Sequence, residues 1–337
     1  MKAALLTEVR KIEMTEMPQP TPGPTDVLVK VMACGLCPND LRMYSGMASW
    51  TKLPTTLGHE PAGVVTAVGE KVRSFKAGDK VAGEQSLRCG YCKPCVEGRE
   101  NLCLNRKSTS NGALAEYVLM KEQYVNKFTN ATFDEEAFTE PLSCVINGEK
   151  NSRVRLGDTV AIVGSGQIGL MHMQVARLTG ARTIVIDLKA DRLEFAAKLG
   201  ADYVIDSSKT DPVTKVKELT GGDMADRVVV AIGNSAAIET GIQLAGKMGS
   251  VNVFASTNPP TKISVDPNLI HHNEVSLIGS YDKTAADLRL ATRLIDQHRI
   301  DVKSMITHTF DLEHTGEALQ TLEKGAGVKI VVRPNNA

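Results

Sequence analysis

The segment TVAIVGSGQIGLMHM, residues 159–173, decides how the second half of this chain folds. It opens with a short run of apolar, β-branched residues, which is typical of a buried strand. Glycines follow at positions 164, 166 and 169, and the stretch after them has the composition of a helix. Glycines also cluster by chance, so the G-x-G-x-x-G pattern carries information here because it joins a strand to a helix.

This pattern indicates a site for the pyrophosphate of a dinucleotide. Gly164 permits the tight turn, Gly166 lets the phosphates approach the backbone, and Gly169 allows close packing of the helix on the strand. The first helical residues, Gln167 and Ile168, then lie where free N–H groups and a partial positive charge face the phosphates. The alternative is a strand-to-helix turn that binds nothing.

Asp187 ends the next apolar run, TIVIDL, where the ribose of a bound dinucleotide would lie. A carboxylate there can accept both ribose hydroxyls of NAD and would repel the 2′-phosphate of NADP. Lys189 and Arg192 are near enough to complicate this choice, and Arg192 is a further cofactor-binding candidate. An aspartate that only caps the next helix is the weaker alternative, because Ala190 or Asp191 is better placed to begin it. We therefore expect NAD.

The surrounding sequence predicts a doubly wound parallel sheet. Between about residues 155 and 281, near-continuous Val/Ile strands alternate with helix-length segments, several of which end at glycine. Such alternation is typical of an α/β domain with helices on both faces of the sheet. We expect residues 148–281 to form this domain, with strands TVAIVG, TIVIDL, DYVID, RVVVAIG, SVNVFA and VSLIGS.

The first part of the chain has a different pattern. Short apolar or alternating runs such as KAALLTEV, DVLVKVMAC and PAGVVTAVG are separated by turn clusters, which predicts a small β barrel or sandwich in residues 1–147. Residues 282–337 contain two amphipathic helices and a closing strand, VKIVVRP. This tail is too short for a third domain, so we expect it to return to the first one.

Bulk composition excludes several classes of function. The 337 residues carry 39 Lys and Arg against 39 Asp and Glu, so there is no basic excess to neutralise nucleic-acid phosphates or a membrane surface. No apolar run is long enough to span a bilayer, and the N-terminus has no signal-peptide pattern. We therefore expect a cytoplasmic protein with a small-molecule substrate.

The segment CGYCKPCVEGRENLC indicates a metal site held within one loop. Its C-x2-C-x2-C-x7-C spacing supplies four thiolates that can close a tetrahedron around Zn²⁺ and leave no position open for a substrate. Such a zinc is structural, because its binding free energy ties down a loop without its own core. Iron–sulfur ligation also uses close cysteines, so the spacing alone does not decide the metal. The four are Cys89, Cys92, Cys95 and Cys103.

Five motifs together resemble the zinc-dependent medium-chain alcohol and polyol dehydrogenases. CGLCPND, LGHEPAGVV, the four-cysteine segment, TEPLSC and GSGQIG occur in the family's order over essentially the whole chain. TEPLSC makes the sequence most similar to the sorbitol and sugar-alcohol branch. The resemblance implies a GroES-like catalytic domain, a Rossmann NAD-binding domain, two Zn²⁺ per chain and a homodimer or homotetramer. The implied reaction oxidises a secondary alcohol to the ketone by hydride transfer.

The resemblance also assigns a catalytic zinc site. Cys37 and His59 match the family's cysteine and histidine ligands, and in this branch Glu60, Glu140 or both bind the zinc directly or through water. A thiolate, an imidazole and a carboxylate leave one position open, as a catalytic zinc requires. Cys144 is a less favoured ligand than Glu140, with which it would share a helix face.

Asp40 and Cys34 receive different roles in this interpretation. Asp40 matches the family's carboxylate that orients the ligand histidine, here His59, through its far nitrogen. Cys34 is more typical of a small core residue than of a ligand.

Two residues depart from the family pattern. Asn39 stands where serine or threonine usually passes the alcohol proton outward, and an amide is a poor proton carrier. We hypothesise that the proton leaves through zinc-bound water or Glu60. Arg42 replaces the histidine of many relatives and could reach an anionic group on cofactor or substrate, or could be a solvated surface residue. Trp50 is a weak candidate for the substrate pocket.

Other functions remain open at this stage. A threonine 3-dehydrogenase-like or phosphosugar-alcohol activity would use the same residues. A zinc-free quinone or enone reductase shares the fold but should lack Cys37, His59 and the four-cysteine segment. A catalytically silent NAD-binding structural or regulatory protein is the alternative from a different class, and Asn39 is the feature that supports it.

Overall fold

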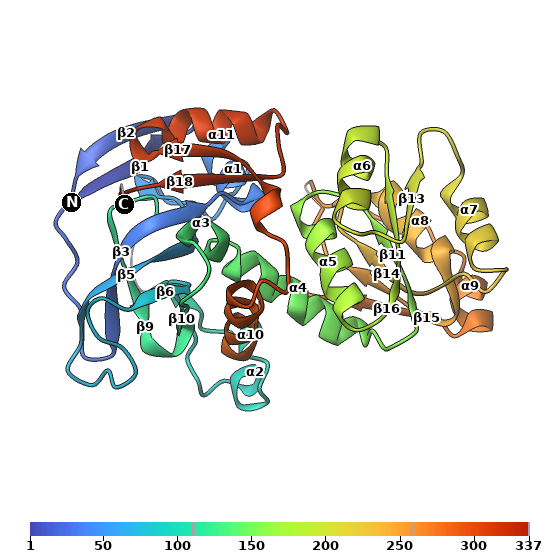
Figure 1. Cartoon of the computed structure of the whole chain (residues 1–337), viewed down its shortest axis with the longest axis horizontal. Coiled ribbons are helices and arrows are strands. Elements are labelled where there is room, and N and C mark those ends of the chain that lie inside the picture. Colours follow the sequence, from blue (N-terminus) through green and yellow to red (C-terminus); the bar gives the residue numbers. More distant parts are fainter. Residues whose placement is uncertain (109–111, 258, 336–337) are drawn as a thin grey trace. The chain divides into compact units, whose positions relative to one another are not determined.

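The computed structural model describes residues 1–108, 112–257 and 259–335. The chain folds into two compact units (Figure 1). The first unit combines Met1–Ser143 with Lys283–Ala337, and the second unit is Cys144–Asp282. The helix α4 (Thr139–Ser152) contains the division between them.

The second unit is built on a six-stranded parallel sheet with the order β13-β12-β11-β14-β15-β16. This doubly wound sheet confirms the predicted fold class, and all six predicted strands are present. Figure 1 shows α5 and α6 on one face and α7, α8 and α9 on the other. The strands are β11 (Thr159–Val163), β12 (Arg182–Asp187), β13 (Tyr203–Asp206), β14 (Ala225–Val230), β15 (Ala245–Val253) and β16 (Ser276–Gly279). The helices are α5 (Gln167–Leu178), α6 (Ala190–Lys198), α7 (Pro212–Leu219), α8 (Ser235–Leu244) and α9 (Pro267–Asn273).

The first unit is β-rich, as predicted. Its largest sheet has the order β10-β6-β5-β3-β18-β17, with β9 also paired to β3. A second sheet has the order β2-β1-β4, and β7 pairs with β8. The strands are β1 (Lys2–Glu8), β2 (Lys11–Glu16), β3 (Asp26–Gly35), β4 (Thr55–Thr56), β5 (Glu60–Val68), β6 (Lys80–Gly83), β7 (Ser86–Leu87), β8 (Lys107–Ser108), β9 (Tyr117–Lys121), β10 (Val125–Lys127), β17 (Ile306–Asp311) and β18 (Lys329–Arg333).

The C-terminal strand β18 lies inside the sheet of the first unit. Val331 and Val332 pair antiparallel with Gly35 and Cys34 of β3, and β17 pairs with the other edge of β18. The apolar side chains of β1, β3 and β18 form one core. Helices complete the unit: α1 (Pro38–Tyr44), α2 (Lys93–Val96), α3 (Phe133–Glu136), the start of α4, α10 (Ala285–Asp296) and α11 (Thr315–Glu323).

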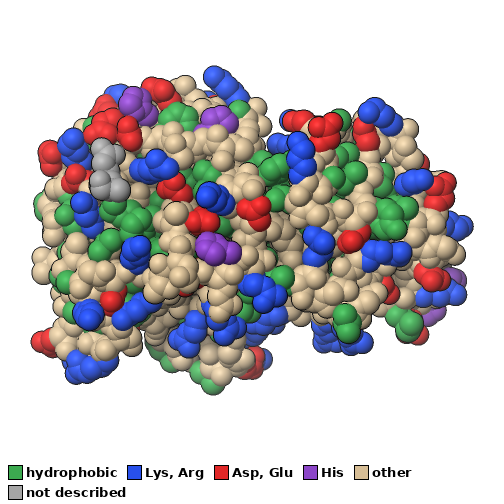
Figure 2. All heavy atoms as spheres, in the orientation of Figure 1, with side chains coloured by type: hydrophobic (Ala, Val, Ile, Leu, Met, Phe, Trp, Pro, Cys, Tyr) green, Lys and Arg blue, Asp and Glu red, His purple; other side chains and the backbone are tan. Residues whose placement is uncertain are grey.

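The surface agrees with the balanced composition. Acidic and basic side chains both occur across the face shown in Figure 2. Among the described residues, no helix has the length and apolar character needed to cross a membrane.

Glu136 of α3 is a fully buried carboxyl group in the first unit. Its Oε2 accepts a hydrogen bond of 2.6 Å from Thr139, while Oε1 has no hydrogen-bond partner among the described residues. Burial raises the pKa of Glu136 to about 9; the bond from Thr139 opposes this, and the charges of Asp296 and Glu135 add to it. The folded protein therefore keeps Glu136 protonated at neutral pH.

We expect Glu136→Gln to stabilise the protein at pH 8 by about 1–3 kcal/mol. An unfolded glutamate ionises near pH ~4.3, so above that pH the unfolded state releases a proton that folded Glu136 keeps. The free energy of unfolding consequently falls as pH rises toward about 9, and the variant should lose this slope. Thermal unfolding across this range measures the effect. The neighbouring Glu135→Gln is the control, because Glu135 caps α3 through Thr132 and should not stabilise; equal effects of both variants would contradict the assignment.

Candidate metal and cofactor sites

Cys37 begins α1 as its N-cap residue. Its Sγ accepts a hydrogen bond of 3.5 Å from the backbone N–H of Asn39, and its own N–H donates to Asp40 Oδ2 at 3.0 Å. Pro38 occupies the first helical position, where its missing N–H costs nothing. The sequence CPND is therefore a local capping structure that fixes the direction of the thiol.

Asp40 connects Cys37 to the loop that carries His59. Its Oδ1 accepts a hydrogen bond of 3.0 Å from Gly58 N and lies 3.3 Å from His59 Nδ1. Burial opposes ionisation of Asp40, but His59 and the N–H groups of Cys37 and Gly58 outweigh it and lower the pKa of Asp40. Burial likewise opposes a charged imidazole, yet Asp40 and Cys37 raise the pKa of His59 well above its usual value. The ring is thereby fixed through Nδ1, with Nε2 facing away from Asp40.

Glu60 completes a group of potential ligands. Atoms of Cys37, His59 and Glu60 all lie within 4.8 Å of one another, which is close enough to hold one metal ion. Glu60 is buried and forms an ion pair with the buried Lys329 of β18. Burial raises the pKa of Glu60, Lys329 lowers it, and the nearby charge of Glu140 raises it further. Donor chemistry and spacing fit zinc, which accepts S, N and O ligands.

Glu140 lies outside this group of three. It is the second residue of α4 and forms an ion pair with the buried Lys283, which also bonds Glu84 at 2.8 Å. Glu84 in turn forms an ion pair with Arg88 at 3.0 Å. These ion pairs connect four buried side chains in a series in which negative and positive charges alternate: Glu140, Lys283, Glu84 and Arg88. The segment that contains Glu140 and Cys144 is helical, which is the condition under which these two residues share one helix face. Sequence reasoning missed Lys283 and Lys329, because a lone lysine in a tail carries no local signal of burial.

The other residues named from the sequence have separate positions. Cys34 is fully buried in the core of the first unit, on β3. Asn39 and Arg42 are partly exposed on α1, and Trp50 is exposed in the loop after it.

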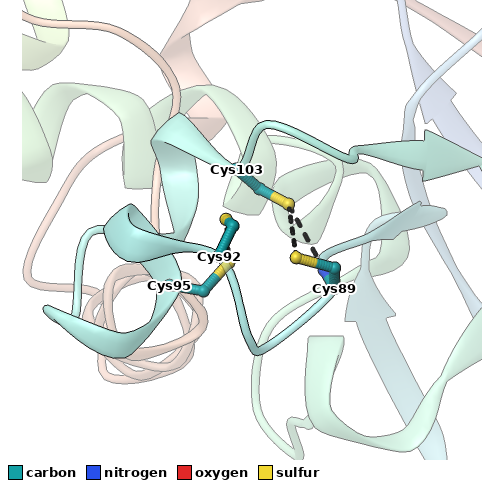
Figure 3. Close-up of side chains that lie close together, drawn as sticks. All are labelled: Cys89, Cys92, Cys95 and Cys103. Carbon is teal, nitrogen blue, oxygen red and sulfur yellow. Dashed lines mark hydrogen bonds between the residues drawn. The ribbon is translucent and has the colours of Figure 1, made fainter.

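The four cysteines of the loop segment point toward one another (Figure 3). Cys92 Sγ lies 3.5 Å from Cys95 Sγ, and Cys103 Sγ lies 3.6 Å from Cys89 Sγ. Sulfur atoms around a tetrahedral zinc with bonds of ~2.3 Å are about 3.8 Å apart, so the spacing fits this metal. Because no disulfide forms among the seven cysteines, all four thiols are available as ligands.

Asn105 is a residue of this site that sequence reasoning missed. Its side-chain amide donates to Cys89 Sγ at 3.5 Å, and its backbone N–H donates to Cys103 Sγ at 3.4 Å. Although burial opposes the thiolate, the Asn105 amide and the backbone N–H groups of Tyr91 and Cys92 lower the pKa of Cys89 to about 6. The sequence feature that could have indicated this role is the position of the polar residue Asn105, two residues after Cys103.

The glycine turn has the geometry of a phosphate cradle. Gly164 has a φ of +103°, which favours glycine, and a side chain on Gly169 would strike Gly164 O at 1.8 Å. Nothing lies within 4 Å of the place where a Gly166 side chain would stand, so the backbone there is open to a ligand. Gly166 also precedes α5 without a side-chain cap, which leaves the first N–H groups of Gln167 and Ile168 available. These features fit a dinucleotide pyrophosphate.

Asp187 lies at the end of β12, beside this turn. Its Oδ2 accepts from the N–H and the hydroxyl of Ser165, both at 2.7 Å, and its Oδ1 accepts from Leu188 N and Lys189 N. Burial opposes ionisation, but the Ser165, Lys189 and Leu188 donors lower the pKa of Asp187. Arg192 lies in the first turn of α6 and is partly exposed.

Known proteins share both units. The profile of the alcohol dehydrogenase GroES-like domain matches residues 23–130, and that of the zinc-binding dehydrogenases matches residues 168–297. A sorbitol dehydrogenase of Halalkalibacterium halodurans is 33% identical and covers 99% of both chains. A D-arabitol-phosphate dehydrogenase of Enterococcus avium is 33% identical over 93% of this chain and 92% of its own. A zinc-binding dehydrogenase of Sinorhizobium meliloti, solved with NADP bound, has a TM-score of 0.93 and 31% identity over 99% of each chain.

The chain therefore belongs to the zinc-binding dehydrogenases with a GroES-like domain. It is an oxidoreductase of the alcohol and polyol dehydrogenase class, as the resemblance in its motifs predicted.

We expect Asn105→Ala to lower the zinc affinity of the four-cysteine site by about 10-fold, the usual effect of removing a residue that bonds a metal ligand. Zinc competition with a chromophoric chelator measures this affinity. Arg106→Ala is the control, because Arg106 bonds Ser86 at 2.8 Å. An unchanged affinity in Asn105→Ala would contradict the role assigned to its amide.

Proposed function

We propose that this enzyme oxidises a secondary alcohol group of a polyol or sugar alcohol to the ketone, with NAD as the hydride acceptor. The observation that carries the proposal is the group of Cys37, His59 and Glu60, whose potential ligand atoms lie within 4.8 Å of one another. The sorbitol and arabitol-phosphate dehydrogenases among its relatives support a polyol substrate.

Cys37, His59 and Glu60 would hold the catalytic zinc, with Glu140 close enough to influence Glu60 electrostatically. Zinc at such a site polarises a substrate hydroxyl and lowers its pKa. Asp40 keeps the His59 ring oriented through Nδ1, which leaves Nε2 to bind the metal. The four cysteines of the loop would hold a second, structural zinc.

Glu60 is the residue that we assign to the alcohol proton. Asn39 stands next to Cys37, but its amide cannot accept and release a proton near neutral pH. Burial favours the protonated form of Glu60, and the ion pair with Lys329 orients its carboxyl group. Where Glu60 binds the zinc through water, its carboxylate can accept the alcohol proton close to Cys37 and His59.

The second unit would bind the cofactor. The open backbone at Gly166 and the N-terminus of α5 would receive the pyrophosphate, and Asp187 would lie beside the ribose. A nicotinamide cofactor held by these residues would supply the acceptor for the hydride of the alcohol carbon. The carboxylate of Asp187 favours NAD over NADP by charge, and Arg192 is a further contact candidate.

A phosphorylated polyol is the second candidate substrate. Arg42 stands in the last turn of α1, the helix that begins at Cys37, and a guanidinium binds phosphate well. The arabitol-phosphate dehydrogenase relative supports this alternative.

We also propose a cytoplasmic homodimer or homotetramer. Seven free cysteines suit a reducing compartment. The edge strand β16 exposes Leu277, so a second copy could cover it.

We expect the purified enzyme to contain two zinc ions per chain and Cys37→Ser to lose one of them together with all activity. A thiolate ligand is replaced by a hydroxyl that zinc binds poorly. Metal analysis and an NAD-coupled assay measure both effects. Cys34→Ala, three residues earlier in the core, should keep both ions. A single zinc in the parent enzyme would instead favour a silent NAD-binding protein.

A substrate panel of neutral polyols, phosphorylated polyols, threonine and butanediols tests the reaction. If Arg42 binds a substrate phosphate, Arg42→Ala should lower kcat/KM for phosphopolyols by about 10-fold and leave neutral polyols within about twofold. Arg73→Ala, on an exposed turn, is the control. Equal losses on both substrate types would remove the phosphate-anchor role, and turnover of threonine alone would overturn the polyol assignment.

A further inference from the structure

The four-cysteine segment contacts the start of α10, the first helix of the returning tail (Figure 1). Glu100, between the third and fourth cysteines, accepts a hydrogen bond of 2.6 Å at Oε1 from the backbone N–H of Ala285. Ala285 is the first residue of α10, and the first N–H groups of a helix have no partner within the helix. The helix dipole also favours a carboxylate at this position. Glu100 therefore fixes the start of α10 from a segment 185 positions away.

The position of Glu100 depends in turn on the cysteines. Its backbone oxygen accepts a hydrogen bond of 3.0 Å from the N–H of Cys103, the last of the four. The two residues are joined by a single 3-10 turn, η1 (Glu100–Leu102), for which Cys103 is the C-cap residue. Zinc bound by the four cysteines would therefore hold this turn, and with it the Glu100 carboxylate, in place.

The first cysteine of the segment leads to the same part of the tail. Arg88 directly precedes Cys89 and forms an ion pair of 3.0 Å with Glu84. Glu84 forms a second ion pair, of 2.8 Å, with Lys283. Lys283 is 2% exposed and stands two residues before Ala285. Contacts from both ends of the four-cysteine segment thus reach the tail where it enters α10.

Lys283 needs a fixed backbone because it lies between two carboxylates in the protein interior. It forms ion pairs with Glu84 and with Glu140. A buried ion pair persists only while its geometry is kept, since separation leaves a charge without compensation. Glu140 in turn acts electrostatically on Glu60 of the candidate catalytic site. Displacement of Lys283 would therefore leave an uncompensated negative charge beside this site.

We propose that Glu100 is a positioning residue: by holding the start of α10 it keeps Lys283 between Glu84 and Glu140, and so couples the four-cysteine segment to the charges beside the candidate catalytic site. This role rests on the proposed zinc of the four-cysteine segment. It gives that zinc an effect beyond tying down its own loop.

Chemical labelling of lysine side chains tests this role without turnover. The zinc-loaded enzyme is treated with a short pulse of an amine-acetylating reagent, and peptide mass spectrometry measures the acetylation rate of each lysine. A buried lysine reacts when its surroundings open locally. Lys283 is therefore the reporter. Lys329 is the internal control, because it is also buried and ion-paired in the first unit but pairs with Glu60.

Glu100→Ala removes the acceptor of the Ala285 N–H and should raise the acetylation rate of Lys283 by about 10-fold, the worth of a hydrogen bond to a charged group. The rate of Lys329 should stay within about twofold of the parent value, because independent sites do not couple. Glu100→Gln keeps an acceptor for Ala285 and should recover most of the protection of Lys283.

Two further variants connect the effect to the segment and its metal. Glu97→Ala is the matched control, because Glu97 belongs to the same segment but lies on the surface, 3.9 Å from Lys93, and its removal should leave Lys283 protected. Cys103→Ser removes one thiolate ligand and releases the zinc. It should raise the acetylation rate of Lys283 at least as much as Glu100→Ala does.

Equal acetylation of Lys283 in the parent and in zinc-loaded Glu100→Ala overturns the coupling. A parallel rise at Lys329 also overturns it, because a general loosening of the first unit would then explain both. Equal rates in Glu100→Gln and Glu100→Ala would exclude the Ala285 contact as the cause and have the same consequence. A parent enzyme without zinc in the four-cysteine segment would overturn the proposed structural metal together with the coupling, whereas the other outcomes overturn the coupling alone.

Discussion

The contact of the Asp40 carboxylate with three neighbours is the interaction on which the candidate catalytic site depends. One oxygen caps Cys37 at the start of α1, while the other accepts from Gly58 N and faces His59. The thiol that caps α1 and the imidazole that precedes β5 are thereby fixed by one side chain. Because Asp40 is buried, it needs these partners as much as they need it.

The charges around this site are neutralised in pairs. Glu60 pairs with Lys329, and Glu140 pairs with Lys283, which also contacts Glu84. Buried charges persist only when they are compensated in this way. The two lysines come from the returning tail, which explains why that tail must be part of the first unit's core.

The sequence predicts much of the fold because its local patterns are strong. Val/Ile runs gave all six strands around β11, and the glycine spacing placed the turn before α5. The ion pairs of Lys283 with Glu140 and of Lys329 with Glu60 could not be predicted from local patterns, because they join residues more than a hundred positions apart in the sequence. The strand β17, ITHTFD, was missed because its alternation is short and polar. The hydrogen bonds of Ser165 to Asp187 likewise depend on coordinates, since a serine inside a glycine turn has no distinctive spacing.

The long sequence separation between Glu60 and Lys329 has a consequence for biosynthesis. The four cysteines of the loop lie within fifteen residues, so this lobe can assemble soon after it leaves the ribosome. The partner of Glu60 arrives only with β18, 269 positions later in the sequence, when this strand inserts beside β3. A nascent or truncated chain can therefore contain a folded four-cysteine segment while Glu60 of the candidate catalytic site still lacks its ion-pair partner, Lys329.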